Sequence, residues 1–275
     1  MSASRMERIL ILAKTYPSPS ASYVETSCVA GITDTGMMRR LYPVPFRMID
    51  DRHQFKKWQW INVRVEKASK DHRPESHRVY VDTIQCGDVV SSKHAWAARW
   101  PWLDKMPCFD RFDTIEETRR TDGLSLALLR PARVDRLEIT PARHSDWTDE
   151  EREKLLHEQM QGELFETEER RSLHELRKIP FDFYYHYTCA GTDGETSHRH
   201  KLVDWEAGAL YWNCVHNHGD QWEVPFRAKL EHQMLKADLM FLLGNMHRFQ
   251  DKWLITSLIY PPKRTPTDDP QLALL

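Results

Sequence analysis

Basic and aromatic side chains alternate in two neighbouring segments of the N-terminal third of this chain of 275 residues. Lysine and arginine neutralise phosphates and release counterions, and flat rings give surfaces on which unstacked bases lie. In this hypothesis the cations contact phosphates and the rings stack on bases; the candidates are Arg39, Arg40, Arg47, Lys56, Lys57, Tyr42, Trp58 and Trp60. The alternative is that the rings belong to the core and the charges only solubilise its edge, because aromatic residues are more often buried than displayed.

Cysteine and histidine gather in a second segment. The candidate ligands for a structural zinc ion are Cys189, His198, His200 and Cys214. Thiolate and imidazole are the ligands that zinc prefers. The spacing matches no known zinc finger and contains no C-x-x-C pair, so a polar loop without metal is the alternative.

Two carboxylates two residues apart, Asp204 and Glu206, are the third candidate. On a strand they would share a face and could hold a divalent ion, as in a metal-dependent nuclease or other hydrolase. At a helix start, Asp204 would instead cap the first free amides, with Glu206 in the first turn. The pattern favours the cap. No segment resembles an activated nucleophile, so we expect a binding protein without a catalytic centre of its own.

The composition is that of a protein with a packed core and no membrane helix. Hydrophobic residues make up 40%, the mean hydropathy is −0.66, and no apolar run approaches the roughly 20 residues that cross a bilayer. Five widely spaced cysteines argue against a disulfide framework and indicate a reducing, cytoplasmic location. Residues 1–147 carry an excess of five positive charges and residues 148–275 an excess of seven negative ones, so a polyanion would meet the N-terminal part.

Short strands separated by turns predict an α+β fold. We expect a hairpin over residues 27–42 turning at Thr33 to Gly36, strands over 58–66 and 79–84, two strands about Pro131 over 124–139, and a strand with an aromatic face over 181–188. The strand over 58–66 has an apolar face of Ile61, Val63 and Val65 and a polar, partly basic face of Trp60, Asn62, Arg64 and Glu66. We also expect irregular helix over 92–121, helices over 204–214 and 225–235, and a terminal hairpin over 239–260. Thr148 and the acidic residues after it predict a helix to about residue 171. The predicted units are a basic and aromatic lobe (1–147), an acidic helical connector (148–177), a C-terminal α+β lobe (178–264) and a flexible tail (265–275). In a third alternative, the tryptophans of residues 96–102 and the acidic helix form a protein-interaction surface.

Several short segments resemble the dual OB domain proteins, a prokaryotic group often encoded among antiphage genes. The resemblance lies in residues 8–14, 28–32, 36, 40–47, 55–61 and 125–131, and extends to 204–206 and 253–255. It implies two small OB-like barrels and binding of DNA or RNA. It also implies a recognition or accessory subunit of an antiviral defence system, beside a nuclease, helicase or NTPase and away from any membrane.

Overall fold

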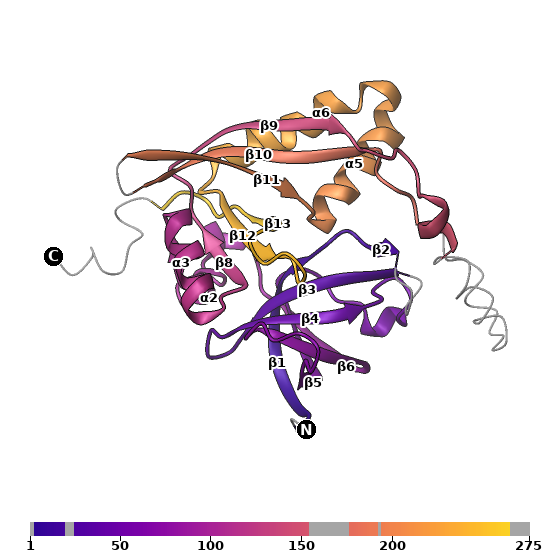
Figure 1. Ribbon diagram of the computed structural model, residues 1–275, viewed down its shortest axis with the longest axis vertical. Helices are drawn as coiled ribbons and strands as arrows, with labels where there is room; N and C mark the ends of the chain where they lie inside the picture. Colours follow the sequence, from indigo (N-terminus) through magenta and orange to yellow (C-terminus); the bar gives the residue numbers. More distant parts are fainter. Residues whose placement is uncertain (1–2, 20–24, 154–175, 192–193, 265–275) are drawn as a thin grey trace.

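The computed structural model describes residues 3–19, 25–153, 176–191 and 194–264. The chain forms two halves, a β-barrel from the N-terminal part and a larger mixed sheet with helices from the rest (Figure 1). No helix among the described residues is both long and apolar enough to cross a bilayer. All five cysteines are free thiols.

Five strands close the barrel. They are β1 (Arg5–Lys14), β3 (Glu25–Thr33), β4 (Met38–Val44), β5 (Gln59–Lys67) and β6 (Ser76–Val89), with β2 (Ser18–Pro19) beside β3 and the short 3-10 helix η1 (Asp51–His53) before β5. The order is β1-β5-β6-β4-β3, and β3 pairs again with β1. Only β4 and β6 run parallel among these barrel pairs. A closed five-stranded barrel of this kind is the architecture of OB-like domains.

The predicted hairpin and the predicted strand with one apolar face are both present in the barrel. β3 and β4 pair across a turn in which Gly36 has a φ of 85°, a backbone conformation that glycine adopts without strain. In β5, Ile61, Val63 and Val65 are buried inside the barrel. The alternation of residue types therefore set the inward face of this strand.

The second half contains a seven-stranded sheet in the order β7-β8-β12-β13-β11-β10-β9. Its strands are β7 (Cys108–Phe109), β8 (Leu126–Leu129), β9 (Arg133–Pro141), β10 (Phe181–Ala190), β11 (Glu195–Leu202), β12 (Met240–Asn245) and β13 (Trp253–Ile259). The helices are α1 (Lys93–Trp96), α2 (Trp100–Leu103), α3 (Phe112–Asp122), α5 (Trp205–His218), η3 (Gly219–Gln221), α6 (Glu223–Arg227), η4 (Ala228–Gln233) and η5 (Met234–Lys236). The predicted strands on either side of Pro131, the aromatic strand after Pro180 and the terminal hairpin are present as β8, β9, β10 and β12 with β13.

Two features of this half differ from the sequence-based expectation. Strands β7, β8 and β9, which we expected in a lobe ending at residue 147, are hydrogen-bonded into the second sheet. The second half is also a sheet rather than a second small barrel, because no pairing among the described residues joins its edge strands β7 and β9. The sequence did not predict this arrangement because β8 pairs with β12, which is far away in the sequence. A pairing over that separation leaves no signal in local periodicity.

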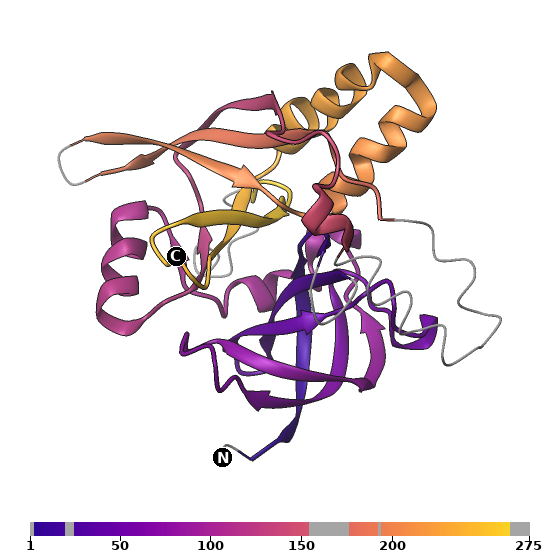
Figure 2. The same ribbon diagram turned by 45° about the vertical axis from the view of Figure 1, so that its right-hand side comes forward.

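The second sheet lies between the barrel on one side and helices α5 and α6 on the other, whereas α1 and α2 pack on the barrel side (Figure 2). In β8, Leu126 and Leu128 face the barrel while Ala127 and Leu129 face the helix side. The barrel strand β1 is buried on both faces as well: its odd-numbered isoleucines fill the barrel, and Leu10 packs against the second sheet. The two halves therefore share one hydrophobic core.

The helix predicted after residue 148 begins as expected. Residues 149–153 are helical, Thr148 Oγ1 accepts a hydrogen bond from the Glu151 amide, and the Glu151 carboxylate accepts one from the Thr148 amide. This reciprocal pair is a capping box. The rest of the predicted helix (154–175) and the tail (265–275) lie outside the described residues.

Candidate nucleic-acid interface

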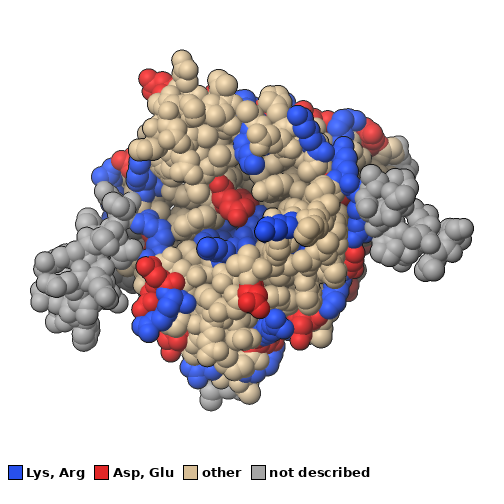
Figure 3. Space-filling view, turned by 180° about the vertical axis from the view of Figure 1, so that it is seen from behind, with Lys and Arg blue, Asp and Glu red and all other residues tan. Residues whose placement is uncertain are grey.

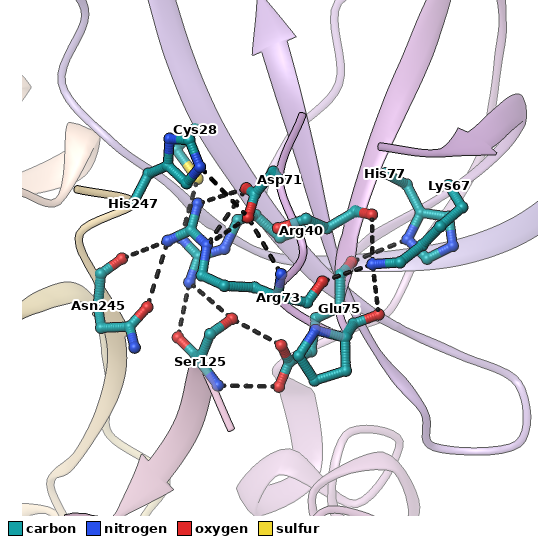
Figure 4. A network of polar contacts seen from close by, with 12 residues as sticks. Cys28, Arg40, Lys67, Asp71, Arg73, Glu75, His77, Ser125, Asn245 and His247 are labelled. Atoms are coloured by element: carbon teal, nitrogen blue, oxygen red, sulfur yellow. Dashed lines mark hydrogen bonds and ion pairs between the residues drawn. The ribbon is translucent and has the colours of Figure 1, made fainter. Parts of the chain in front are cut away.

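Arg40, predicted to contact phosphate, is instead part of the junction between the two halves. Its side chain is only 4% exposed. One terminal nitrogen donates to the Ser125 carbonyl oxygen at 2.6 Å, and the Ser125 hydroxyl donates to the Glu75 carboxylate at 2.6 Å (Figure 4). A buried cation must have polar partners. Arg40 therefore joins β4 to β8 and is not available to a ligand.

Arg73 completes this junction. It donates to the Asn245 carbonyl oxygen at 2.6 Å and forms an ion pair with Asp71 at 2.6 Å. Although burial raises the pKa of Asp71, hydrogen bonds from Arg73 and Ser76 hold that pKa well below its usual range. We call these six residues the seam: Arg40, Asp71, Arg73, Glu75, Ser125 and Asn245.

Two other predicted cations are paired within the barrel. Arg39 is buried and donates to Glu7 at 2.7 Å. Arg47 forms an ion pair with the buried Glu25 at 3.2 Å. In both pairs the guanidinium neutralises a carboxylate of its own barrel, so the local count of basic residues overstated the charge that is free to meet a ligand.

The remaining predicted cations and the tyrosine lie nearer the surface. Lys57 donates to the Leu258 carbonyl oxygen at 2.8 Å and to Glu206 at 3.2 Å, which ties the barrel to the second half. Lys56 is exposed, and Tyr42 is 50% exposed. Of the eight predicted residues, Lys56 and Tyr42 are the two that the structure places in the exposed class.

The two predicted base-stacking tryptophans belong to the core, as the alternative reading of the sequence proposed. Trp58 is 3% exposed and Trp60 is 5% exposed. The guanidinium of Arg99 lies 4.7 Å from the ring centre of Trp58, and that of Arg8 lies 4.5 Å from the ring centre of Trp60. Each ring therefore holds an arginine in place through a cation–π contact. Of these two arginines, Arg8 lies in the exposed class.

Arginines held on rings continue along the outer surface of β5. Arg64 lies 4.1 Å above the Tyr80 ring, and Arg78 lies 5.4 Å from the same ring. Strand pairing places Arg8 opposite Asn62, and Arg64 opposite Tyr80. We call this surface the β5 basic face: Arg8, Asn62, Arg64, Arg78 and Tyr80.

The arginines of the β5 basic face have no carboxylate partner among the described residues. Neither Arg8 nor Arg78 makes an ion pair there, and Nε of Arg64 is buried without a hydrogen-bond partner. Glu66 is occupied by the Tyr80 hydroxyl, which donates to it at 2.8 Å. A guanidinium stacked on a ring keeps its N–H donors free for a phosphate.

One signal in the sequence pointed to this face. The alternation within residues 58–66 predicted a polar, partly basic outer surface of Trp60, Asn62, Arg64 and Glu66, and strand pairing places Glu66 opposite Arg78. Arg8, Arg78 and Tyr80 were missed because only the registers of β1 and β6 against β5 bring them to that surface.

The four predicted zinc ligands do not come together. Cys189 is buried on β10 and Cys214 on α5, while His198 and His200 lie on β11, which was not predicted as a strand. No group of three or more histidine, cysteine, aspartate or glutamate side chains suited to a metal ion occurs in the part of the chain that the structure describes.

The histidines of β11 are held by rings. The imidazoles of His198 and His200 each lie beside Phe112, and Nδ1 of His200 is 2.8 Å from the Tyr187 hydroxyl. Burial and the neighbouring His198 lower the pKa of His200 to about 4, so its ring is neutral at pH 7. A polar cluster packed in this way is structural.

The predicted helix cap is confirmed. Asp204 accepts hydrogen bonds from the Glu206 amide at 2.7 Å and from the Leu258 amide at 3.0 Å, and α5 begins at the next residue. Both carboxylate oxygens of this buried side chain are therefore occupied. Burial raises the pKa of Asp204, while Lys57 acts in the opposite direction.

Basic side chains also line a hollow between the two halves. Figure 3 shows lysine and arginine side chains in a hollow, with acidic side chains beside them. The structure gives a hollow of about 290 Å³ between the halves, lined by Lys57, Trp58, Ser92, Trp96, Arg99, Glu206 and Tyr260.

Comparison with solved structures gives a similarity that spans most of the chain. It is to a chain of the structure titled "Structure and Conformational Change of a Replication Protein A Heterotrimer Bound to ssDNA". The two chains share 10% identity with a TM-score of 0.25, over 94% of this chain and 66% of that one. This protein thus spans just under two thirds of that chain. No curated protein matches.

Two family profiles match, and the change from one to the other falls where the structure passes from α2 to β7. Residues 5–105 match the profile described as Domain of unknown function (DUF8758), which covers the barrel, α1 and α2. Residues 109–274 match Domain of unknown function (DUF8757). Because this second match extends over more than half of the sequence, the chain belongs to the DUF8757 family.

Proposed function

We propose that the protein binds nucleic acid by its phosphate backbone on the β5 basic face. The observation that carries the proposal is that arginines on neighbouring strands are held on aromatic rings with no carboxylate partner in the described chain. Cations that are positioned but not neutralised attract phosphates and release counterions from them.

The geometry explains why this face, rather than the predicted one, would meet the ligand. The outer sides of β1 and β3 are covered by the second sheet, and Arg40 on β4 is held in the seam. Arg8 and Arg78, by contrast, lie in the exposed class. Rigid stacking on Trp60 and Tyr80 lowers the conformational entropy that each arginine loses on binding a phosphate.

In this proposal the chain is a recognition or accessory subunit, the role that the resemblance to the dual OB domain proteins implies for a defence system. Phosphate contacts position a strand without reading its sequence. We therefore expect similar affinities for oligonucleotides of different sequence.

The test is a binding titration with a fluorescent 5′-hydroxyl oligothymidylate of about 12 nucleotides, within the usual range of binding-site sizes. The double variant R8A/R64A should bind at least about tenfold more weakly, because two charge-assisted contacts are lost. The slope of log K against log salt should fall in magnitude by roughly 0.7 for each lost contact.

The matched control is R130A/R133A, which removes the same charge from two arginines of the second half that already pair with carboxylates. It should bind like the wild type. An unchanged affinity and salt slope in R8A/R64A, or an equal loss in the control, would remove the β5 basic face from the binding site.

A further inference from the structure

The hollow between the halves contains polar groups that the rest of the fold does not use. The guanidinium of Arg99 donates through Nε to the Val90 carbonyl oxygen at 3.0 Å. Its two terminal nitrogens have no hydrogen-bond or ion-pair partner in the described chain. The hydroxyls of Ser92 and Tyr260 line the same hollow and are likewise without a hydrogen bond to any described residue.

Arg99 is held firmly in spite of lacking a counter-ion. Its guanidinium lies 4.7 Å from the ring centre of Trp58 and 4.5 Å from that of Trp96, and these two rings meet edge to face at 5.2 Å. Tyr260 stands 6.0 Å from Trp96. Burial lowers the pKa of Arg99, which shows that its charge is partly desolvated. A desolvated cation without a carboxylate partner favours an anion beside it.

Unusual backbone conformations concentrate at this hollow. Trp58, His94, Ala95 and Trp96 have φ values between 51° and 66°, and they are the non-glycine residues with positive φ in the described chain. Such conformations cost free energy and persist where the surroundings hold them. Here they hold the rings of Trp58 and Trp96 together beside the Arg99 guanidinium.

The second cation of the hollow, Lys57, is shared with an acidic group. Its ammonium donates to Glu206 at 3.2 Å and to the Leu258 carbonyl oxygen at 2.8 Å, and it lies 3.9 Å from the buried Asp204 carboxylate. The Glu206 side chain is 54% exposed. An incoming anion would therefore meet Arg99 with free donors, and Lys57 with one exposed partner, Glu206, that is able to move aside. Asp204 and Leu258 would meanwhile hold the ammonium in place.

We propose that this hollow binds a phosphate monoester, whether on a small free molecule such as a mononucleotide or at the 5′-phosphorylated end of a strand. A tetrahedral phosphate has three terminal oxygens, which suits the separate donors of Arg99, Lys57, Ser92 and Tyr260 better than a planar carboxylate does. At about 290 Å³ the hollow matches a small ligand, at the lower end of the roughly 300 to 1,000 Å³ of ligand sites. The inference goes beyond strand binding on the β5 basic face and does not depend on it.

Calorimetric titration with thymidine 5′-monophosphate, inorganic phosphate and thymidine tests the proposal. The two phosphate-bearing probes should bind and thymidine should not. R99Q should weaken binding of the monophosphate about 10- to 100-fold, the range expected for a lost hydrogen bond to a charged group. E206Q should strengthen it about threefold or more, because a negative charge beside the ligand is removed and the Glu206 carboxylate no longer competes for Lys57.

The matched control for the second variant is E223Q on α6, whose side chain is 49% exposed and paired with Arg227. It should leave the titration unchanged. Circular dichroism and the melting temperature establish that each variant is folded. If R99Q does not fold, the affinity of E206Q for the monophosphate tests the proposal alone.

Oligonucleotides with and without a 5′-phosphate distinguish the two sources of the ligand. A 5′-phosphorylated strand that binds more tightly than the same strand with a 5′-hydroxyl, with that gain lost in R99Q, identifies a strand end, whereas equal affinities of the two strands identify a free nucleotide. R8A/R64A should leave the monophosphate titration unchanged. The proposal for the β5 basic face can therefore fail while the proposal for the hollow stands. Absence of phosphate binding, equal binding of thymidine, or wild-type behaviour of the folded variants would overturn the proposal.

Discussion

The seam and the β5 basic face use the same residue type on the same barrel in opposite ways. In the seam, Arg40 and Arg73 are buried and donate to oxygens of the second half. On the β5 basic face, Arg8 and Arg64 lie on rings and have no carboxylate partner in the described chain. What an arginine can bind is decided by what stands opposite it, because a guanidinium buried beside a carboxylate or carbonyl has already used its donors.

The difference has an energetic origin. Removing one partner of a buried ion pair leaves an uncompensated charge, at a cost of about 3 to 5 kcal/mol. An exposed arginine stacked on a ring contributes about 0.5 to 1 kcal/mol through that contact. The seam should therefore govern stability, whereas the β5 basic face should govern affinity.

The largest expected effect lies in the seam. R73M should lower the free energy of unfolding by about 3 kcal/mol, because Asp71 loses its ion pair and Asn245 loses a donor to its carbonyl oxygen. Urea denaturation followed by tryptophan fluorescence measures the change. The control K70M replaces an exposed lysine of the same loop and should alter stability by less than about 0.5 kcal/mol. A loss equally small in R73M would show that the seam does not hold the halves together.

An intermediate effect is expected from a buried neutral group in the second half. The pKa of His200 is lowered to about 4, below its unfolded value near 6.5. Between pH 6.5 and 4 the unfolded chain binds a proton that the folded chain does not. Stability therefore falls as the pH drops through that window.

H200Q removes this titration. From pH 7.5 to 4.5 the variant should lose about 2 kcal/mol less unfolding free energy than the wild type. Urea denaturation at both pH values checks the difference, with H216Q, an exposed histidine on α5, as control. Parallel losses in H200Q and the wild type would show that His200 is not the group that titrates.

The smallest effect tests ring stacking on the β5 basic face. R64K keeps the charge but loses the planar fork that lies on Tyr80. We expect an affinity for oligothymidylate about threefold weaker, an unchanged salt slope and a stability change under about 0.5 kcal/mol. Titration at several salt concentrations measures the affinity and the salt slope, and urea denaturation measures the stability. A loss as large as that of an alanine variant, or a changed slope, would mean that charge and stacking cannot be separated here.

Local patterns predicted the elements better than the sites. The hairpin at Gly36, the inward face of β5, the cap at Asp204 and the helix start at Thr148 follow from interactions between near neighbours, and each is present. β11 was missed because its residues Glu195–Leu202 are nearly all polar. It is a strand because β10 and β13 pair with it on either side.

The sequence by itself determined most of the segments that form strands, where several helices begin, and that basic and aromatic side chains concentrate in the barrel. Only the tertiary structure decided which of those cations are free. The donors of Arg40 are used by Ser125, which lies 85 positions away in the sequence. Arg8 stacks on Trp60, a ring from another strand. Charge and residue type are local properties, but neutralisation and burial depend on groups that folding brings from elsewhere in the chain.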